Sequence, residues 1–359
     1  MRGRANGGPA SRPLGGARLL SWVGAYQSGG LLVALLGLGA FFASSNANFL
    51  HVSNLKVVLL QVSIVGIVAI PGSMLLLSGY LDLSVGSVSV LAAALFGLMA
   101  QAEGASLAVA IVVALAVGAA WGLMNGLLTA YLGFSPVVVT LGGYAGARGV
   151  SDAITNDNTR MGFGSKFSVL GNGTLFGLPV PAVIFIGVFV FGLYLWYETP
   201  LGRHLTAIGA DRNAARSVGV SVKRIPMLVY VCSGVAAAVG GLILTSELDG
   251  ASPSIGMGLE LQVLTAILLG GVAFSGGRGS LWGVLFGVFF IGVLNNGLIL
   301  LNVGPYYVNI AVGAVLLLVA GIDVFYRRLE RIPIMTADQA EVSSAPSEAL
   351  VVGSGETHP

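Results

Sequence analysis

Amide and hydroxyl side chains stand inside several long apolar runs of this chain. Burying a polar side chain within a lipid environment is costly, so such residues usually face the interior of a helix bundle or a water-filled path. Side chains that hydrogen-bond without a fixed charge suit an uncharged ligand rich in hydroxyl groups. Candidates for a polar path, with hydrogen bonds between helices as the alternative for each, are Asn125, Thr140, Gln262, Asn295 and Asn296.

No arrangement of residues typical of catalysis is found in the sequence. The histidines His51, His204 and His358 stand in three separate polar stretches, and Cys232 is the single cysteine. One cysteine forms neither an internal disulfide nor a thiolate metal cluster. The phosphate-binding pattern G-x-x-x-x-G-K-[ST] is absent,. We therefore predict no catalytic residue, no metal and no cofactor, and any ATP used would be hydrolysed by another chain.

The composition indicates that lipid is the solvent of this chain. Of its 359 residues 55% are hydrophobic and 9% charged, and the mean hydropathy is +0.91. Soluble domains carry about 25% charged residues, and a helix needs roughly 20 apolar residues to cross a bilayer. We predict an all-α integral membrane protein of about ten transmembrane helices, at 29–44, 55–78, 83–100, 106–132, 136–151, 179–197, 226–246, 259–275, 280–302 and 305–323.

Two of these segments are short for a full span. The segment at 259–275 is one of them, and the other, 136–151, begins at Ser135-Pro136 and contains four glycines. A broken or re-entrant segment is therefore expected at 136–151. Glu260, at the outer end of 259–275, is expected to lie close enough to the interface to be solvated.

Basic residues indicate the orientation, because cytoplasmic loops of membrane proteins carry an excess of them. If residues 1–28 are cytoplasmic, 13 of the 17 lysines and arginines are inside, and Lys56, Arg148, Arg160 and Lys166 are outside. We predict a cytoplasmic segment 1–28, a transmembrane domain 29–325 and a cytoplasmic, disordered tail 326–359. A cleaved signal peptide over the first apolar run is the alternative, and it would leave later sidedness unchanged.

Small residues recur every fourth position in two segments, at 110–130 and at Gly279, Gly283 and Gly287. This spacing places them on one helix face, where they let two helix backbones approach closely. The fourth segment also contains Asn125-Gly126-Leu127, similar to Asn296-Gly297-Leu298 in the ninth. This similarity raises the hypothesis of two inverted halves of five helices each.

A single carboxylate, Asp82, precedes the third apolar segment, in Leu81-Asp82-Leu83-Ser84. A carboxylate at a helix N-terminus accepts backbone N–H bonds and faces the positive end of the helix dipole. Asp82 and Ser84 are therefore predicted either to cap this helix or to take part in gating.

The polar stretch 198–225 is too long for a plain turn. Asp211 is placed to cap a short helix through Ala214 and Ala215, and Gly219 suits its C-terminal end,. Such a helix could lie on the lipid surface or insert into a groove on a partner, and the spacing favours neither.

Several of these stretches together resemble the ribose-type permeases of ATP-binding-cassette sugar importers. The resemblance runs from about residue 30 to 325 and rests on an ordered set of motifs. They are Leu81-Asp82-Leu83-Ser84-Val85-Gly86-Ser87, Asn125-Gly126, Ser135-Pro136 through Thr140-Leu141-Gly142, Arg148-Gly149, the 198–225 loop, Gly270-Gly271 with Ser275-Gly276-Gly277-Arg278-Gly279-Ser280, and Asn296-Gly297-Leu298.

The resemblance implies a subunit of a bacterial plasma-membrane importer that moves a monosaccharide without bond chemistry of its own. The implied partners are a second permease copy or close relative, an extracytoplasmic sugar-binding protein and ATP-binding subunits. The ATP-binding subunits would dock on the 198–225 coupling loop, at Gly209, Asn213, Ala214, Ala215, Arg216 and Gly219.

Two positions depart from the family pattern. Glu247 stands where arginine is common, and Gln262 where aspartate is usual. Both put the identity of the sugar in doubt rather than the fold. Branched-chain amino-acid permeases share the wider superfamily, and a stand-alone secondary transporter remains a third reading.

Overall fold

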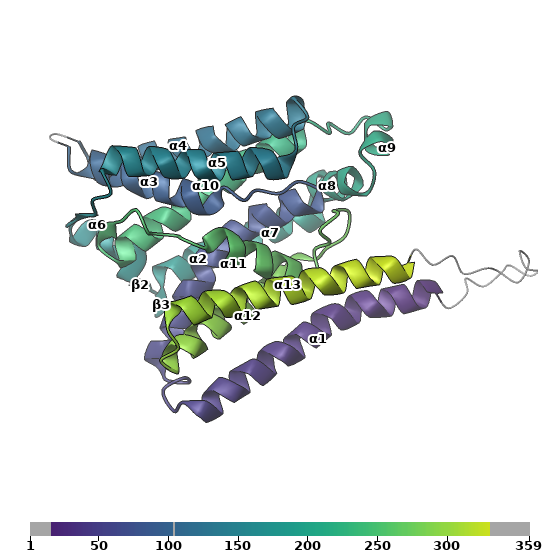
Figure 1. Cartoon of the computed structure of the whole chain (residues 1–359), viewed down its shortest axis with the longest axis horizontal. Helices are drawn as coiled ribbons and strands as arrows, with labels where there is room; N and C mark the ends of the chain where they lie inside the picture. Colours follow the sequence, from purple (N-terminus) through teal and green to yellow (C-terminus); the bar gives the residue numbers. More distant parts are fainter. Residues whose placement is uncertain (1–15, 103–104, 331–359) are drawn as a thin grey trace, which may run out of the picture. The chain divides into compact units, whose positions relative to one another are not determined.

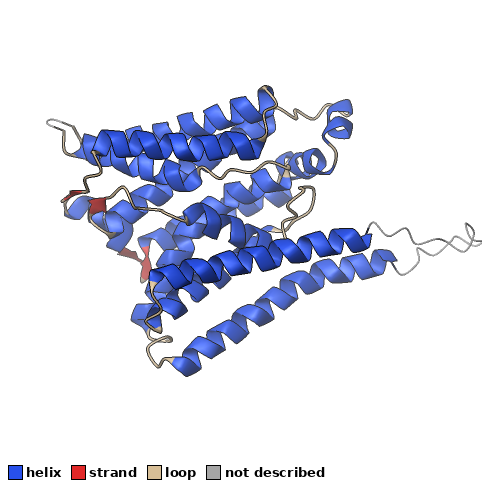
Figure 2. Ribbon diagram, viewed as in Figure 1, coloured by secondary structure: helices blue, strands red, loops and turns tan. Residues whose placement is uncertain are grey.

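The computed structural model describes residues 16–102 and 105–330, and the chain divides into two compact units after Ala320. The described residues are predominantly helical, with two short pairs of strands (Figures 1 and 2). The α-helices are α1 (Gly16–Ser45), α2 (Val52–Leu77), α3 (Val85–Ala100), α4 (Leu107–Gly126), α5 (Pro136–Thr155), α6 (Ser165–Asn172), α7 (Val180–Leu193), α8 (Pro200–Ala210), α9 (Arg212–Ser217), α10 (Arg224–Glu247), α11 (Leu259–Leu269), α12 (Leu281–Leu300) and α13 (Pro305–Glu330).

Two helices end in a wider π-helical turn. The turn η1 (Leu127–Tyr131) extends α4, and η2 (Tyr194–Glu198) extends α7. Of the strands, β1 (Arg160–Met161) pairs antiparallel with β4 (Gly250–Ala251), and β2 (Thr174–Leu175) pairs with β3 (Leu178–Pro179).

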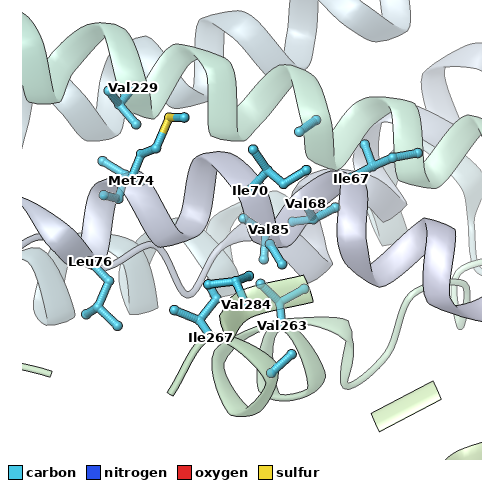
Figure 3. Close-up of a cluster of buried hydrophobic side chains, with 14 of the residues drawn as sticks. Ile67, Val68, Ile70, Met74, Leu76, Val85, Val229, Val263, Ile267 and Val284 are labelled. Carbon is cyan, nitrogen blue, oxygen red and sulfur yellow. The ribbon is translucent and has the colours of Figure 1, made fainter. Parts of the chain in front are cut away.

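Helix α2 forms the centre of the first unit. From Val62 to Leu77 nearly all of its residues are buried, whichever way they point. A helix that is apolar all round needs neighbours on every side, and α7, α10, α11 and α12 provide them. Figure 3 shows Met74 of α2 beside Val229 of α10, and Val263 and Ile267 of α11 beside Val284 of α12.

Glycines allow two helix pairs to come into backbone contact, as their spacing predicted. A side chain at Gly118 or Gly122 of α4 would collide with the carbonyl oxygens of Gly234 and Tyr230 of α10. Gly283 and Gly287 of α12 lie in the same way against Gly270 and Ala266. Gly279 was wrongly placed in this stripe, because α12 begins only at Leu281.

Each of the ten apolar segments predicted from sequence overlaps a helix, although α11 ends at Leu269 rather than at 275, and the mainly helical fold is confirmed. Among the described residues, five helices are long and apolar enough to cross a membrane by length and composition. Helix α11 has 11 residues, which at 1.5 Å per residue cover about 16 Å. The break expected at 136–151 is not observed, because α5 runs without interruption from Pro136 to Thr155.

Two groups of short elements lie at opposite ends of the long helices (Figure 1). The helices α8 and α9 are at one end, and α6 with the strands β2 and β3 is at the other. The sequence predicted one short helix in the 198–225 loop, whereas the structure has two, because Thr199 caps an additional helix by accepting from the Leu201 N–H. The N-terminal 15 residues and the tail after Glu330 lie outside the described residues.

Candidate functional site

Asp82 is the centre of a hydrogen-bonded cluster where α3, α4 and α10 meet. Its Oδ1 accepts from the Ser84 N–H at 3.0 Å and from the Ser84 hydroxyl at 2.6 Å, while its Oδ2 accepts from the Ser233 hydroxyl at 2.8 Å. The Asn125 amide donates to Ser84 Oγ at 2.8 Å. Asp82 therefore ties the turn before α3 to both neighbouring helices.

This arrangement differs from a simple helix cap. Ser84 stands at the N-cap position of α3, but its side chain makes no capping bond. Asp82 instead stabilises the turn that leads into the helix and reaches across to α10. Two roles were predicted for Asp82 and Ser84. The structure shows a junction between helices in place of the predicted cap, and the gating role stays a prediction.

Two tyrosines and an arginine connect this junction to the 198–225 loop. The Tyr230 hydroxyl donates to the Leu81 carbonyl at 2.9 Å, and its ring meets the Tyr80 ring edge-to-face at 6.1 Å. The Arg212 guanidinium lies over the Tyr80 ring at 5.6 Å and donates to the Ala130 carbonyl at 3.2 Å. Contacts thus run without a gap from the first residue of α9 to Asp82.

Helix α9 confirms the local prediction made from sequence. Asp211 caps it, accepting from the backbone N–H groups of Asn213 and Ala214 at 2.8 and 3.0 Å. Gly219 ends the segment with φ of +85°, in the left-handed region that favours glycine,. The cap and the terminating glycine together explain a helix of only six residues.

The two faces of α9 differ sharply. Ala215 is 3% exposed and packs into the main hydrophobic cluster. Asn213, Ala214 and Arg216 on the other face are exposed, and so is Gly219. Only the outward face is accessible to a partner, so Ala215 has a packing role.

Gly209, also predicted in this loop, lies at a backbone junction. A side chain there would collide with the Leu77 carbonyl at the end of α2, and the N–H of Gly277 donates to that same carbonyl at 2.7 Å. The C-terminal end of α8 is therefore fixed against two loops of the helix bundle.

A second cluster of polar side chains, separate from the Asp82 junction, lies between α2, α10, α11, α12 and α13. It is a cavity of about 280 Å³. Four amide side chains line it: Gln61, Gln262, Asn295 and Asn309. The Asn295 amide donates to Gln262 Oε1 at 3.0 Å. None of the lining residues is charged, and the rest of the wall is largely apolar, with Ile64, Val65 and Leu259 among it.

The remaining candidates from sequence do not line this cavity. Thr140 is fully buried and donates to the Pro136 carbonyl of its own helix at 2.8 Å. Asn296 exchanges two hydrogen bonds with Asn54, at 2.9 and 3.0 Å. The alternative role, a hydrogen bond between helices, describes Asn296, whereas the Thr140 hydroxyl donates within its own helix. Asn125 belongs to the Asp82 junction.

Sequence reasoning missed Gln61 and Asn309 of the cavity and Ser233 of the junction. A signal for Gln61 was available, because it is a polar residue within the predicted second segment. Glu260 was expected in contact with water, but its Oε2 is buried against Gly86. The reason is that α3 begins beside the short helix α11, so the two N-terminal ends meet.

Comparison with known proteins identifies the family. The family model described as "Branched-chain amino acid transport system / permease component" matches residues 54–320, which include the Asp82 junction and the amide-lined cavity. The chain belongs to this family. It is a multi-pass membrane protein, as the apolar helices also indicate.

Several relatives are named sugar import permeases. The chain is 36% identical to the ribose import permease protein of Bacillus subtilis over 302 residues, which cover 84% of this chain and 94% of the relative. It is 32% identical to the fructose import permease protein of Rhizobium meliloti, with 83% and 85% covered, and 30% identical to a D-allose transport system permease protein of Escherichia coli, with 82% and 88% covered. No solved structure matches this chain.

Proposed function

We propose that this chain is the membrane-spanning permease subunit of an ATP-driven importer of a monosaccharide, a pentose, hexose or related polyol. The observation that carries the proposal is the similarity, over more than four fifths of the chain, to permeases named for the import of ribose, fructose and allose. In this proposal ten helices cross the membrane, both termini are cytoplasmic, and an extracytoplasmic binding protein delivers the sugar.

The geometry of α9 supports coupling to a separate ATPase. Its outward face presents Asn213, Ala214 and Arg216, while its inward face is packed. Arg212 contacts Tyr80 and the π-helical turn η1, and Lys223 also donates to that turn, at Tyr131, at 3.4 Å. A helix held on both sides in this way can transmit the movement of a docked subunit to the bundle.

Import of a branched-chain amino acid is the second candidate function, favoured by the description of the family model. An amino acid carries an ammonium and a carboxylate, which need charged or strongly hydrogen-bonding partners once out of water. The relatives at 30–36% identity are named for sugars instead. A reconstituted importer offered D-ribose, D-fructose and L-leucine separates the two candidates directly.

The test of coupling is Ala214→Glu, which adds volume and charge on the exposed face of α9. The permease should lose co-purification with its ATPase, and substrate-stimulated ATP hydrolysis should fall by more than about tenfold, since a charge buried in a docking groove lacks a partner. Thr174→Glu, an equally exposed substitution in β2 at the opposite end, is the matched control and should leave both unchanged. Ala215→Glu is unsuitable, because that side chain is buried.

Two results would contradict this proposal. One is undiminished docking of the ATPase on the Ala214→Glu variant. The other is uptake of sugar by proteoliposomes that hold this chain alone, driven by an ion gradient without ATP, as a secondary transporter would do.

A further inference from the structure

We infer that an open groove between the π-helical turn η2 and helix α8 binds the phosphate headgroup of one anionic phospholipid from the inner leaflet. The groove has a volume of about 490 Å³. Trp196 and Tyr197 of η2 line one side of it, and residues of α8 from Gly202 to Ala210 line the other. The inference goes beyond the proposed import function and takes from it only the orientation of the chain.

The groove lies where two long apolar helices end. The turn η2 closes the candidate span Val180–Glu198, and the Tyr197 hydroxyl lies 3.3 Å from the hydroxyl of Ser280, the residue just before α12. Tyr194, Tyr197 and Trp282, at these two helix ends, are 56%, 46% and 49% exposed. Tyrosine and tryptophan are enriched at the depth of lipid headgroups. We therefore expect the groove in the headgroup layer, on the side that the basic residues place in the cytoplasm.

Arg203 gives the groove its charge. It is the only charged side chain of the lining, it is exposed, and it makes no hydrogen bond or ion pair with any described residue. A guanidinium binds a phosphate group through two parallel hydrogen bonds. The Thr206 hydroxyl already donates to the Gly202 carbonyl at 2.9 Å, but Tyr197 and Ser280 share one hydrogen bond, so one of their two protons stays free. One arginine and one hydroxyl thus offer donors to a phosphate.

The rest of the lining favours a lipid over a free phosphate ion. Trp196, Ala207 and Ala210 are apolar, and covering such surface with the glycerol and upper acyl carbons of a lipid is favourable, because it removes apolar area from water. Inorganic phosphate has no apolar part to place there. An exposed ion pair with one arginine contributes little by itself. The ligand is therefore the phospholipid.

A docked ATPase is the rival occupant, because α8 belongs to the 198–225 loop. Helix α8 packs on α2, α10 and η2 at the end of the bundle, whereas α9 packs mainly on α8. The groove is therefore at the base of the loop, bordered by the ends of two long apolar helices, while the outward face of α9 is presented farther from them. Lipid headgroups reach the base of the loop without displacing anything that docks on α9.

The experiment measures lipid binding by the purified full-length permease alone. Its melting temperature in detergent is recorded with phosphatidylglycerol, phosphatidylcholine or inorganic phosphate added. The anionic phosphatidylglycerol should raise it by about 2–4 °C or more. Zwitterionic phosphatidylcholine should raise it less, and inorganic phosphate not at all. Arg203→Gln should abolish the phosphatidylglycerol shift, and it should fold normally because the Arg203 side chain is exposed and has no described partner to lose.

Two further variants separate the charge from the groove. Arg224→Gln removes an exposed arginine on the same side of the protein, outside the groove, and should keep the full shift. Thr206→Trp leaves Arg203 in place but fills the groove from an exposed position, and it should abolish the shift. The ATPase should still co-purify with Arg203→Gln, because the groove holds lipid.

Four outcomes overturn the inference. Equal shifts with phosphatidylglycerol and phosphatidylcholine would show that the charge is not recognised, and an equal shift with inorganic phosphate would show a site for the free ion. An unchanged shift in Arg203→Gln or in Thr206→Trp would place the lipid elsewhere. The absence of a phosphatidylglycerol shift in the wild type removes the site, and loss of the ATPase from Arg203→Gln would then assign the groove to the ATPase.

The lipid site and the proposed function fail separately. The melting temperatures are measured without sugar, binding protein or ATPase. An importer complex that moves no sugar overturns the proposed function and leaves the lipid site, whereas a permease without the phosphatidylglycerol shift loses the site and remains an importer.

Discussion

The Asp82 junction and the amide cavity are both clusters of polar side chains inside a bundle of apolar helices, yet the first is built around a paired carboxylate and the second lies beside open space. At the junction, three donors converge on one carboxylate and fill both of its oxygens. In the cavity, two amide oxygens have no partner among the described residues, and open space lies between the helices. The carboxylate of the junction is fully paired, although the neighbouring Asn125 Oδ1 has no hydrogen-bond partner among the described residues, and a paired carboxylate of this kind fixes structure.

Close contact between helix backbones occurs beside both regions. The junction lies beside α4 and α10, whose backbones touch at Gly118, Gly122 and Gly234. The cavity lies between α2, α10, α11, α12 and α13, of which α11 and α12 also come into close backbone contact, at Gly270, Gly283 and Gly287. Close backbone contact favours rigidity, since interiors packed at this density resist any change of volume.

The largest expected effect comes from Asp82→Ala. Removing the carboxylate leaves the Ser84 and Ser233 donors buried without an acceptor, at about 1–3 kcal/mol for each unsatisfied group. We expect a loss of about 3 kcal/mol or more in the free energy of unfolding, measured as a lower denaturant midpoint in detergent, and a reduced membrane yield.

Asn295→Ala is the counterpart in the cavity, and its cost should be clearly smaller, because Asn295 loses one hydrogen bond, to Gln262 Oε1, whereas the Asp82 carboxylate accepts three. If both variants lose equal stability, the distinction between the paired carboxylate and the amide beside open space fails.

The next largest effect should come from Gly122→Leu. The added side chain would collide with the carbonyl oxygen of Tyr230, so α4 and α10 must separate beside the junction. Overpacking of this kind costs about 1–3 kcal/mol, and the melting temperature in detergent should fall accordingly. Gly187→Leu in α7 is the control, since no atom lies within 4 Å of a side chain there. A wild-type melting temperature for Gly122→Leu would show that the two helices are not rigidly joined.

The smallest effect on stability, and the clearest test of orientation, comes from single cysteines. In a background with Cys232 replaced by serine, Met257→Cys at the cavity mouth should react with an impermeant thiol reagent from outside the cell. Thr206→Cys, on an exposed position of α8, should react only from inside. Labelling of both from the same side would contradict the orientation of the cavity and of the coupling loop together.

Local features of this protein could be predicted from sequence because each depends on a short stretch of chain. The positions of the apolar helices follow from hydropathy, and the start and end of α9 follow from Asp211 and Gly219. For the close contact between α4 and α10, the sequence predicted only the face of α4 that takes part. The four-residue spacing showed which face of α4 would pack, but not that Tyr230 and Gly234 would meet it.

The sequence by itself determined a helical membrane protein with uncharged polar residues in its spans, because composition and periodicity are properties of the chain alone. Only the tertiary structure decided which of those residues share a site. Asn295 and Gln262 lie together at the cavity, while the neighbouring Asn296 pairs with Asn54 instead. One residue along a helix rotates a side chain by about 100°, so neighbours in sequence face different partners, and those partners come from helices far away in the chain.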